Sequence, residues 1–365
     1  MSFTSASVEE YFDPSEFESV PKIDAHFHYS TNDPAVLRKA ESINMHMVTI
    51  NTELGLSIYN QLKMSKKHKN QYPTIFDFIG TFSTDNFNDD DFSDKAISQI
   101  KKCMEAGAKG IKIWKNIGLK LRDKSGKYVT VDHEKFVPIF TYLEKKNIPL
   151  LAHLSEPRNC WLPYDEITMA SELQYFKICP SYYMYLHPET PSYEQQIAAR
   201  DRILERYPKL RFIGAHVASL EWNLDEVADR LKRFPEFYVE ISARIGHIQL
   251  QTMQNKEKVR KFFIDWQDRI IYGSDGMLFD NSILKIIYCI VFRKNWERQK
   301  KHPFFYQEWK NQWLFFATKE SVPCEKFNME NAPQYIDGLQ LPKQVVNKIF
   351  YENVSRVMNL KKSYG

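Results

Sequence analysis

The chain has 365 residues, of which 43% are hydrophobic and 26% are charged, so it can bury a core and shows no compositional sign of disorder. Its 50 basic and 46 acidic side chains are interspersed and leave a net charge of only +4, which argues against a nucleic-acid partner. The five cysteines are scattered and never spaced as CxxC, which favours a reducing compartment.

No targeting or membrane signal stands out. Residues 1–17, MSFTSASVEEYFDPSEF, are acidic and lack the apolar run of a signal peptide. The longest apolar stretch, Ile283 to Phe292, contains Lys285 and has about half the length that a membrane crossing needs. We interpret it as a buried helix, and we expect a cytoplasmic protein without a membrane partner.

Short apolar or alternating runs recur along the chain, each followed by a longer charged stretch with helical periodicity. This alternation is typical of strand–helix units that build a parallel sheet. The predicted strands are KIDAHFH (22–28), HMVTIN (46–51), FDFIGTFS (76–83), KGIKIWK (109–115), PLLAH (149–153), RFIGAH (211–216), FYVEIS (237–242) and RIIYGSD (269–275). Eight strands close a barrel, so we predict the α/β class and a single (β/α)8-barrel domain over 22–365, after an N-terminal extension of residues 1–21.

Helices and two long connections fill the rest of the chain. Helices are predicted at 35–42, 94–106, 134–146, 195–207, 223–234 and 256–268. The connections after strands five and eight, at about 155–193 and 276–336, are long and rich in aromatic residues. Because loops after barrel strands open onto the catalytic face, both are candidate lids or pocket walls. Extra helices packed on the barrel, or an interface within a homo-oligomer, are the alternative.

Polar side chains gather at the ends of four predicted strands. In the first strand, Asp24, His26 and His28 alternate with apolar residues, and the polar face is expected to point into the barrel because helices cover the outer face. The same inward alternation places three further residues at strand ends: His153, His216 and Asp275. Imidazole nitrogens and carboxylate oxygens suit zinc and similar divalent ions, so a metal site is the simplest reason to gather them.

The IDAHFH strand, the histidines that close AHLSEP and IGAHVAS, and the aspartate of IIYGSDG resemble the amidohydrolase superfamily. They are most similar to its amidohydrolase-related (amidohydrolase 2) branch of metal-dependent TIM-barrel hydrolases and decarboxylases, and the resemblance extends from about residue 22 to IFYENVSRVM. It implies that His26, His28 and Asp275 bind a divalent metal, most readily zinc. His153 is implied as a fourth ligand. The resemblance leaves His216 either as ligand of a second metal or as an acid/base group over the substrate.

The fourth strand bears on whether the site holds one ion or two. Binuclear relatives such as phosphotriesterases bridge their metals with a carboxylated lysine in this strand, and Lys112 has the inward position for that role. The alternative is that Lys112 forms an ion pair with a buried carboxylate such as Asp24 or Glu240.

Three residues near the predicted mouth are candidates for substrate binding. Lys115 lies at the rim, where it would meet an anionic substrate. Arg244 follows strand seven and either clamps a carboxylate or phosphate or is an ordinary solvated arginine. Glu156, in the loop after His153, either contacts substrate, orients an imidazole or caps its loop.

These residues favour an enzyme acting on a small molecule. The leading hypothesis is a metal-dependent hydrolase that uses activated water to cleave an amide, lactone or ester, with Asp275 and His216 as the catalytic proton-transfer groups. The alternative is a metal-dependent decarboxylase (lyase) acting on a carboxylated small molecule. A non-catalytic barrel would have no chemical need for ligands at four strand ends.

Overall fold

A computed structural model describes residues 9–53, 57–280 and 303–360. Its main sheet is parallel, with the order β8-β7-β6-β5-β4-β3-β2-β1-β9. The strands are β1 (Lys22–Ser30), β2 (Met45–Ile50), β3 (Phe76–Thr81), β4 (Ile111–Ile113), β5 (Leu150–Ala152), β6 (Phe212–Gly214), β7 (Phe237–Glu240), β8 (Ile270–Ile271) and β9 (Gly276–Phe279). The apolar stretch 283–292, predicted as a buried helix, lies outside the described residues.

β8 and β9 act as two halves of one eighth strand. β8 pairs with β7, and β9 pairs with β1. Between them, Ala25 N donates to Tyr272 O (3.2 Å) and Asp275 N donates to His26 O (2.8 Å). These bonds close the sheet, which confirms the predicted α/β barrel. They also make 276–279 part of the barrel, although the sequence pattern predicts these residues in the second long connection.

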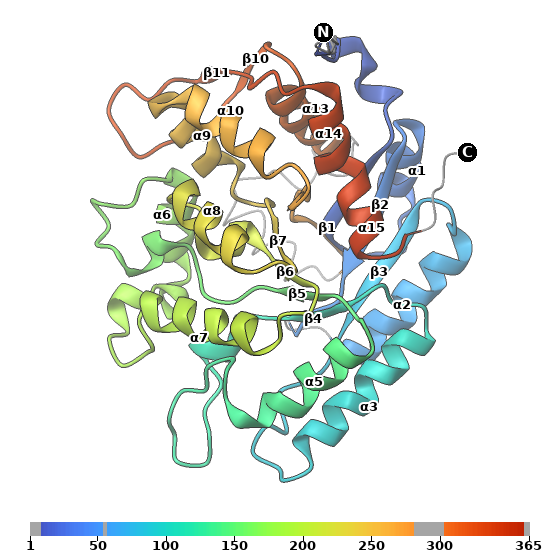
Figure 1. The fold of residues 1–365 in the computed structure, drawn as a ribbon, viewed down its shortest axis with the longest axis vertical. Helices are drawn as coiled ribbons and strands as arrows, with labels where there is room; N and C mark the ends of the chain where they lie inside the picture. The colour runs from blue at the N-terminus through green and yellow to red at the C-terminus, as the bar shows by residue number, and fades with distance from the viewer. Residues whose placement is uncertain (1–8, 54–56, 281–302, 361–365) are drawn as a thin grey trace, which may run out of the picture.

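Helices surround the strands (Figure 1). In chain order they are α1 (Ala35–Ser42), α2 (Ile58–Gln71), α3 (Phe92–Glu105), α5 (Val137–Lys145), α7 (Tyr193–Arg206), α8 (Leu224–Arg233), α9 (Ile245–Gln254) and α10 (Lys256–Asp265). The six predicted helices correspond to α1, α3, α5, α7, α8 and α10. α2 and α9 were not predicted. The buried residues of α2 are the polar Gln61, Ser65 and His68, so the usual apolar stripe is missing. None of the helices in the described ranges has the length and apolar character needed to span a bilayer.

The first long connection is an ordered layer with its own small core. It holds α6 (Ala170–Ile178) and the short turns η3 (Arg158–Trp161), η4 (Pro180–Tyr182) and η5 (Met184–Leu186). The Tyr183 ring is buried and stacks on Tyr164, with centroids 4.5 Å apart, and on Phe176 at 5.3 Å. Stacked aromatic rings thus account for much of the aromatic content of this segment.

The described part of the second long connection begins with α13 (Pro303–Ala317) and continues through the hairpin β10 (Ser321–Pro323) and β11 (Tyr335–Asp337). The chain then forms α14 (Lys343–Asn347), a π-helical turn η7 (Lys348–Glu352) and α15 (Asn353–Val357). α13 holds the N-terminal extension in place, because Phe17 of the turn η1 (Pro14–Glu18) packs on Tyr306 and Trp313. Val354 of α15 packs with Ile23 and other strand residues that fill the barrel interior.

Candidate metal centre

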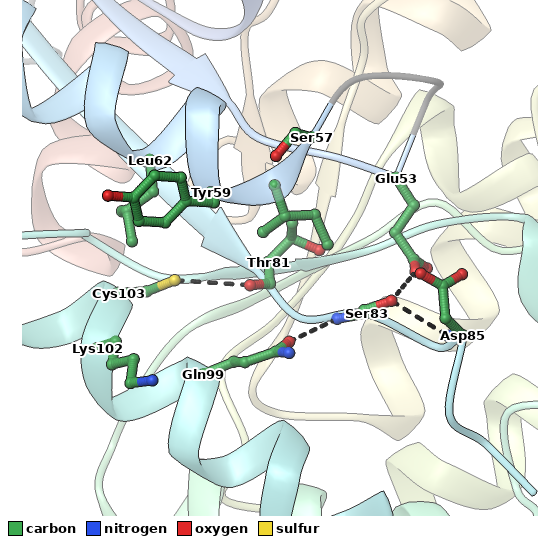
Figure 2. A pocket seen from close by; sticks show the side chains of 11 residues that line it. Glu53, Ser57, Tyr59, Leu62, Thr81, Ser83, Asp85, Gln99, Lys102 and Cys103 are labelled. Carbon is green, nitrogen blue, oxygen red and sulfur yellow. Dashed lines mark hydrogen bonds between the residues drawn. The ribbon is translucent and has the colours of Figure 1, made fainter.

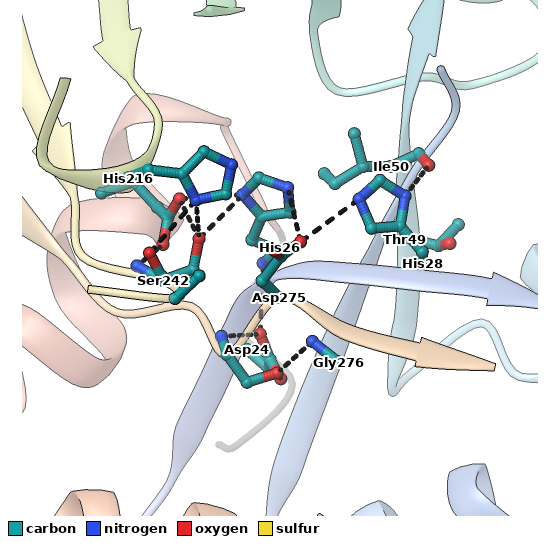
Figure 3. Close-up of polar contacts among 12 residues, drawn as sticks. Asp24, His26, His28, Thr49, Ile50, His216, Ser242, Asp275 and Gly276 are labelled. Atoms are coloured by element: carbon teal, nitrogen blue, oxygen red, sulfur yellow. Dashed lines mark hydrogen bonds and ion pairs between the residues drawn. The ribbon is translucent and has the colours of Figure 1, made fainter. Parts of the chain in front are cut away.

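A β-bulge in β1 decides which of its side chains face the barrel interior. The register between β1 and β2 shifts between Asp24 and Phe27, which moves the alternation by one residue. Ala25 belongs to the same buried cluster inside the barrel as Ile23 and Val354, yet His26 also faces inward after the bulge. Figure 3 shows Asp24 on the opposite side of the strand from the histidines. The prediction that Asp24 shares their face was therefore wrong, because simple alternation does not foresee the bulge.

Asp24 instead ties the barrel to α13 and to the bend that carries Asp275. Its carboxylate accepts hydrogen bonds from Trp309 Nε1 (2.9 Å), from Ser274 N (3.0 Å) and from Ser274 Oγ (2.5 Å). Burial raises the pKa of the Asp24 carboxyl to about 6, although these hydrogen bonds act in the opposite direction. Asp24 is thus a structural group and is not the ion-pair partner of Lys112.

Replacing Trp309 with phenylalanine should destabilise the protein more than the same change at Trp313. Both side chains are buried in α13, but Trp309 donates to Asp24, whereas Trp313 Nε1 has no hydrogen-bond partner among the described residues. The Trp309→Phe variant should lose about 1–3 kcal/mol more in free energy of unfolding, because a buried carboxylate loses a donor. Urea unfolding of the two variants measures the difference, and equal losses would contradict this role for Asp24.

Two imidazoles and a carboxylate converge at the C-terminal ends of the strands (Figure 3). Asp275 Oδ1 lies 3.5 Å from His26 Nε2 and 3.4 Å from His28 Nε2. On the far side of each ring, His26 Nδ1 lies 2.8 Å from Glu240 Oε2 and His28 Nδ1 lies 3.1 Å from Ile50 O. A backbone carbonyl oxygen and an ionised carboxylate can only accept hydrogen bonds. Each Nδ1 therefore carries the proton and donates it.

That tautomer makes the three atoms a set of ligands. Each Nε2 presents a lone pair to the Asp275 carboxylate, so three electron-rich atoms face one another and repel unless a cation lies among them. Burial holds the pKa of His26 well below its usual range, with the charge of Lys112 adding to the effect. The donor set therefore fits a divalent metal.

His153 and His216 complete the cluster. Their ring centroids are 4.2 Å apart, and the His216 ring lies 4.9 Å from that of His26. His216 Nδ1 lies 3.1 Å from Ser242 O, so its Nε2 carries the lone pair. His153 Nε2 is buried and finds no hydrogen-bond partner in the part of the chain that is described, and burial lowers the pKa of this histidine. An unpartnered neutral imidazole nitrogen at this place fits a further metal ligand.

A left-handed turn, rather than strand alternation, brings His216 into the site. Ile213 packs inside the barrel, and Gly214 faces outward, where a Cβ would lie 2.4 Å from that of Ala218. Residues 216–219 then have φ angles of 55–58°. His216 thus lies beside His26 and His153, but the alternation of strand six is not what places it there. The left-handed conformation costs roughly 1–2 kcal/mol per residue, so contacts elsewhere must hold the turn.

Lys112 points into the barrel, as predicted, and is 1% exposed. Burial lowers its pKa to about 8, while the charges of Glu240 and Asp275 oppose this effect. Its Nζ has no hydrogen-bond partner among the residues that the structure describes. Lys112 therefore forms no direct ion pair with Glu240, and the two charges attract each other only over a longer distance.

Lys115 and Glu156 form a buried ion pair with each other. The Lys115 Nζ also lies 4.7 Å from the ring centre of Tyr182 and 5.6 Å from that of Tyr175, which belong to the first long connection. The segment after β4 and the first long connection thus meet at this ion pair, whose two charges compensate each other.

Arg244 is not an ordinary solvated arginine, the alternative predicted from its sequence position, since its side chain is only 12% exposed. Its Nη1 lies 3.7 Å from Glu172 of α6, whereas its Nε has no hydrogen-bond partner in the described ranges. Glu172 is held by His247 Nε2 (2.9 Å) and Asn159 Nδ2 (2.7 Å). Sequence reasoning missed Glu172, because a single acidic residue in a helix carries no motif.

A separate hollow of about 460 Å³ lies between α2 and α3 (Figure 2). It contains none of the predicted site residues and is lined in part by Glu53, Ser83 and Asp85. Glu53 accepts hydrogen bonds from Thr84 N (2.6 Å) and Asn116 Nδ2 (2.7 Å), which joins the segments after β2, β3 and β4. Glu53 therefore connects these segments, and the candidate metal ligands lie elsewhere, at the histidines and Asp275.

Comparison with known proteins identifies the family of this chain. A family model described as Amidohydrolase matches residues 86–360, which include His153, His216 and Asp275 but not the strand of His26 and His28. No curated protein matches. A solved 2,6-dihydroxybenzoate decarboxylase in complex with 2,6-dihydroxybenzoate is similar at 12% identity and a TM-score of 0.51, over 93% of this chain and 99% of that one.

A Staphylococcus aureus protein assigned to the amidohydrolases is similar at 17% identity and a TM-score of 0.50, over 93% of this chain and 100% of that one. At such identities the two solved structures show a shared fold. The family model spans well over half of the chain, which confirms the resemblance first noted in the strand-end motifs. The chain therefore belongs to the amidohydrolase family and is a metal-dependent enzyme of the amidohydrolase superfamily.

Proposed function

We propose that the protein is a hydrolase that uses activated water to cleave a C–N or C–O bond of a small amide, lactone or ester. The observation that carries the proposal is the approach of His26 Nε2 and His28 Nε2 to within 3.5 Å of Asp275 Oδ1, with both Nδ1 atoms held by acceptors. We propose these three residues and His153 as ligands, with zinc as the expected ion. When bound, the ion supplies Lewis acidity, which polarises a carbonyl oxygen and acidifies water.

Two side chains of the chain itself have the properties of proton carriers. The side chain of Asp275 is 17% exposed, more than those of His26 and His28, so water can reach its carboxylate, which is able to accept a proton. His216 has its Nδ1 engaged by Ser242 O, which leaves Nε2 free to accept and return a proton. We propose Asp275 as the base and His216 as the group that protonates the leaving atom.

Arg244 is proposed to bind an anionic group of the substrate. Its Nε is buried without a partner among the described residues, and Glu172 lies 3.7 Å from its Nη1, a distance too long for a firm hydrogen bond. Lys115 and Glu156 are proposed to contact the substrate as a pair, whose charges compensate each other. This arrangement favours a small-molecule substrate that carries one carboxylate or a similar anionic group.

Decarboxylation is the second candidate, and two observations favour it. The chain shares its fold with a 2,6-dihydroxybenzoate decarboxylase. Burial lowers the pKa of His153, and the positive charges of Lys115, Lys112 and Arg244 add to the effect, so cations near this ring would favour a carboxylated substrate. In that reaction His216 would protonate the carbon that loses carbon dioxide.

A substrate panel separates the two reactions. The metal-loaded protein is offered lactones, N-acyl amino acids and carboxylated unsaturated or aromatic acids, while base consumption, free amine and carbon dioxide are recorded together. For the hydrolase we expect base consumption with a lactone, or free amine from an N-acyl amino acid, without carbon dioxide. Carbon dioxide release from an acid of the panel would overturn the hydrolase proposal in favour of the lyase.

Lys112 is expected not to bridge two metals. The Lys112→Met variant should keep one ion per chain, because the proposed ligands do not include the lysine and its charge is balanced at longer range by Glu240 and Asp275. Elemental analysis of wild type and variant, both purified with bicarbonate present, measures the stoichiometry. Two ions in the wild type and a loss in the variant would instead identify carboxylated Lys112 as a bridge.

A further inference from the structure

We infer that Tyr193 and Arg200, two side chains of α7, are positioning residues that hold the left-handed turn 216–219 and thereby fix the His216 imidazole in the site. The inference deepens the proposed function and rests on the proposed role of His216 in proton transfer. Neither residue belongs to the predicted site, and neither lies in a recognisable motif.

Both side chains bind carbonyl groups of the turn. Tyr193 OH donates to Ser219 O, and Arg200 Nη1 donates to Ala218 O at 2.5 Å. Tyr193 is 6% exposed and Arg200 is 2% exposed, so water does not compete for these bonds. α7, which lies outside the barrel, thus holds the turn through these two hydrogen bonds.

The turn needs external support because its own residues disfavour its shape. Four consecutive non-glycine residues, among them the β-branched Val217, have φ between 55° and 58°. Relaxation towards right-handed values would rotate His216 away from Ser242 O, the acceptor that sets its tautomer. The carbonyl groups held by α7 oppose that rotation.

The supporting side chains are themselves anchored. Arg200 Nε and Nη2 donate to Asp201 Oδ1 at 3.0 and 2.7 Å, and Arg230 Nε of α8 donates to Asp201 Oδ2 at 3.2 Å. Tyr193 OH accepts from Trp222 Nε1 at 2.8 Å. The charge of the buried Arg200 is therefore paired, and both donors have fixed positions when they reach the turn.

The same turn is tied to the strand that carries His153. Ser219 Oγ donates to Leu154 O at 2.8 Å, one residue beyond that histidine. Because the rings of His153 and His216 lie 4.2 Å apart, a displaced turn would change their mutual placement. Support from α7 therefore acts on the relative geometry of two site imidazoles.

The test uses the full chain with 15N-labelled histidine, and the His216 ring signals are assigned with a His216→Gln variant. The Tyr193→Phe variant removes only the hydroxyl. We expect its His216 ring nitrogen signals to move by more than a linewidth, towards a mixture of tautomers. Arg200→Lys, which retains the charge but not the planar fork, should move the same signals and serves as a second variant if Tyr193→Phe does not fold.

Tyr207→Phe is the matched control, because Tyr207 follows α7, is also 6% exposed and donates from its hydroxyl to Val137 O at 3.2 Å, away from the turn. This variant should leave the His216 signals in place. Unmoved signals in Tyr193→Phe, or equal movement in Tyr207→Phe, would overturn the inference. The signals are read without substrate, so this failure is distinct from a failure of the proposed hydrolase activity.

Discussion

Replacing Asp275 with asparagine should remove both the metal and the activity. The carboxylate is the only anionic member of the proposed ligand set, and it lies 3.5 and 3.4 Å from two imidazole Nε2 atoms that carry lone pairs. Asparagine keeps the shape and loses the charge. Metal affinity should fall by at least about 100-fold, because even changes behind the ligands cost about 10- to 100-fold. Loss of the proton acceptor should lower turnover by a further ~10²- to 10⁴-fold.

The measurement combines metal analysis after dialysis with the rate on the substrate identified by the panel. Asp225→Asn is the control, since Asp225 is an exposed residue paired with Lys258 on the surface. It should match the wild type in both respects. An Asp275→Asn variant that kept a full complement of metal would refute Asp275 as a ligand.

The second large effect is expected at His216, where His216→Gln should abolish most of the turnover while the protein keeps its metal. Glutamine can hydrogen-bond but cannot carry a proton, so the rate should fall by about 10²- to 10⁴-fold. Metal should remain because the proposed ligands are the other three histidines and Asp275. Steady-state rates and metal analysis on the same preparation give both numbers.

His187→Gln is the matched control, since this histidine lies in the first long connection with a third of its side chain exposed. It should retain wild-type turnover. If His216→Gln loses metal along with activity, His216 is a ligand of a second ion. If its turnover is unchanged, His216 has no part in the reaction.

The barrel could be predicted from sequence because its signal is local. Each strand is a short apolar or alternating run, and each of the predicted helices carries an apolar stripe, so the order of elements follows from the periodicity. α2 was not predicted because it buries Gln61, Ser65 and His68, and polar residue types do not indicate a core. Its burial is a tertiary effect that periodicity cannot report.

The convergence of the candidate site residues could be predicted from sequence, but their detailed geometry could not. His26, His28 and Asp275 converge as strand ends should, yet the bulge that turns Asp24 away from them depends on pairing with the next strand. The left-handed turn at His216 is likewise held by side chains distant in sequence. Glu172 reaches Arg244 only through the packing of α6, which no local pattern encodes.

Metal content of the purified protein tests the central claim most directly. Elemental analysis of the folded wild-type chain should find about one divalent ion per chain, because three histidines and an aspartate with free lone pairs make a site of high affinity. Less than about half an ion per fully folded chain, after incubation with excess zinc and removal of the free ion, would contradict the account.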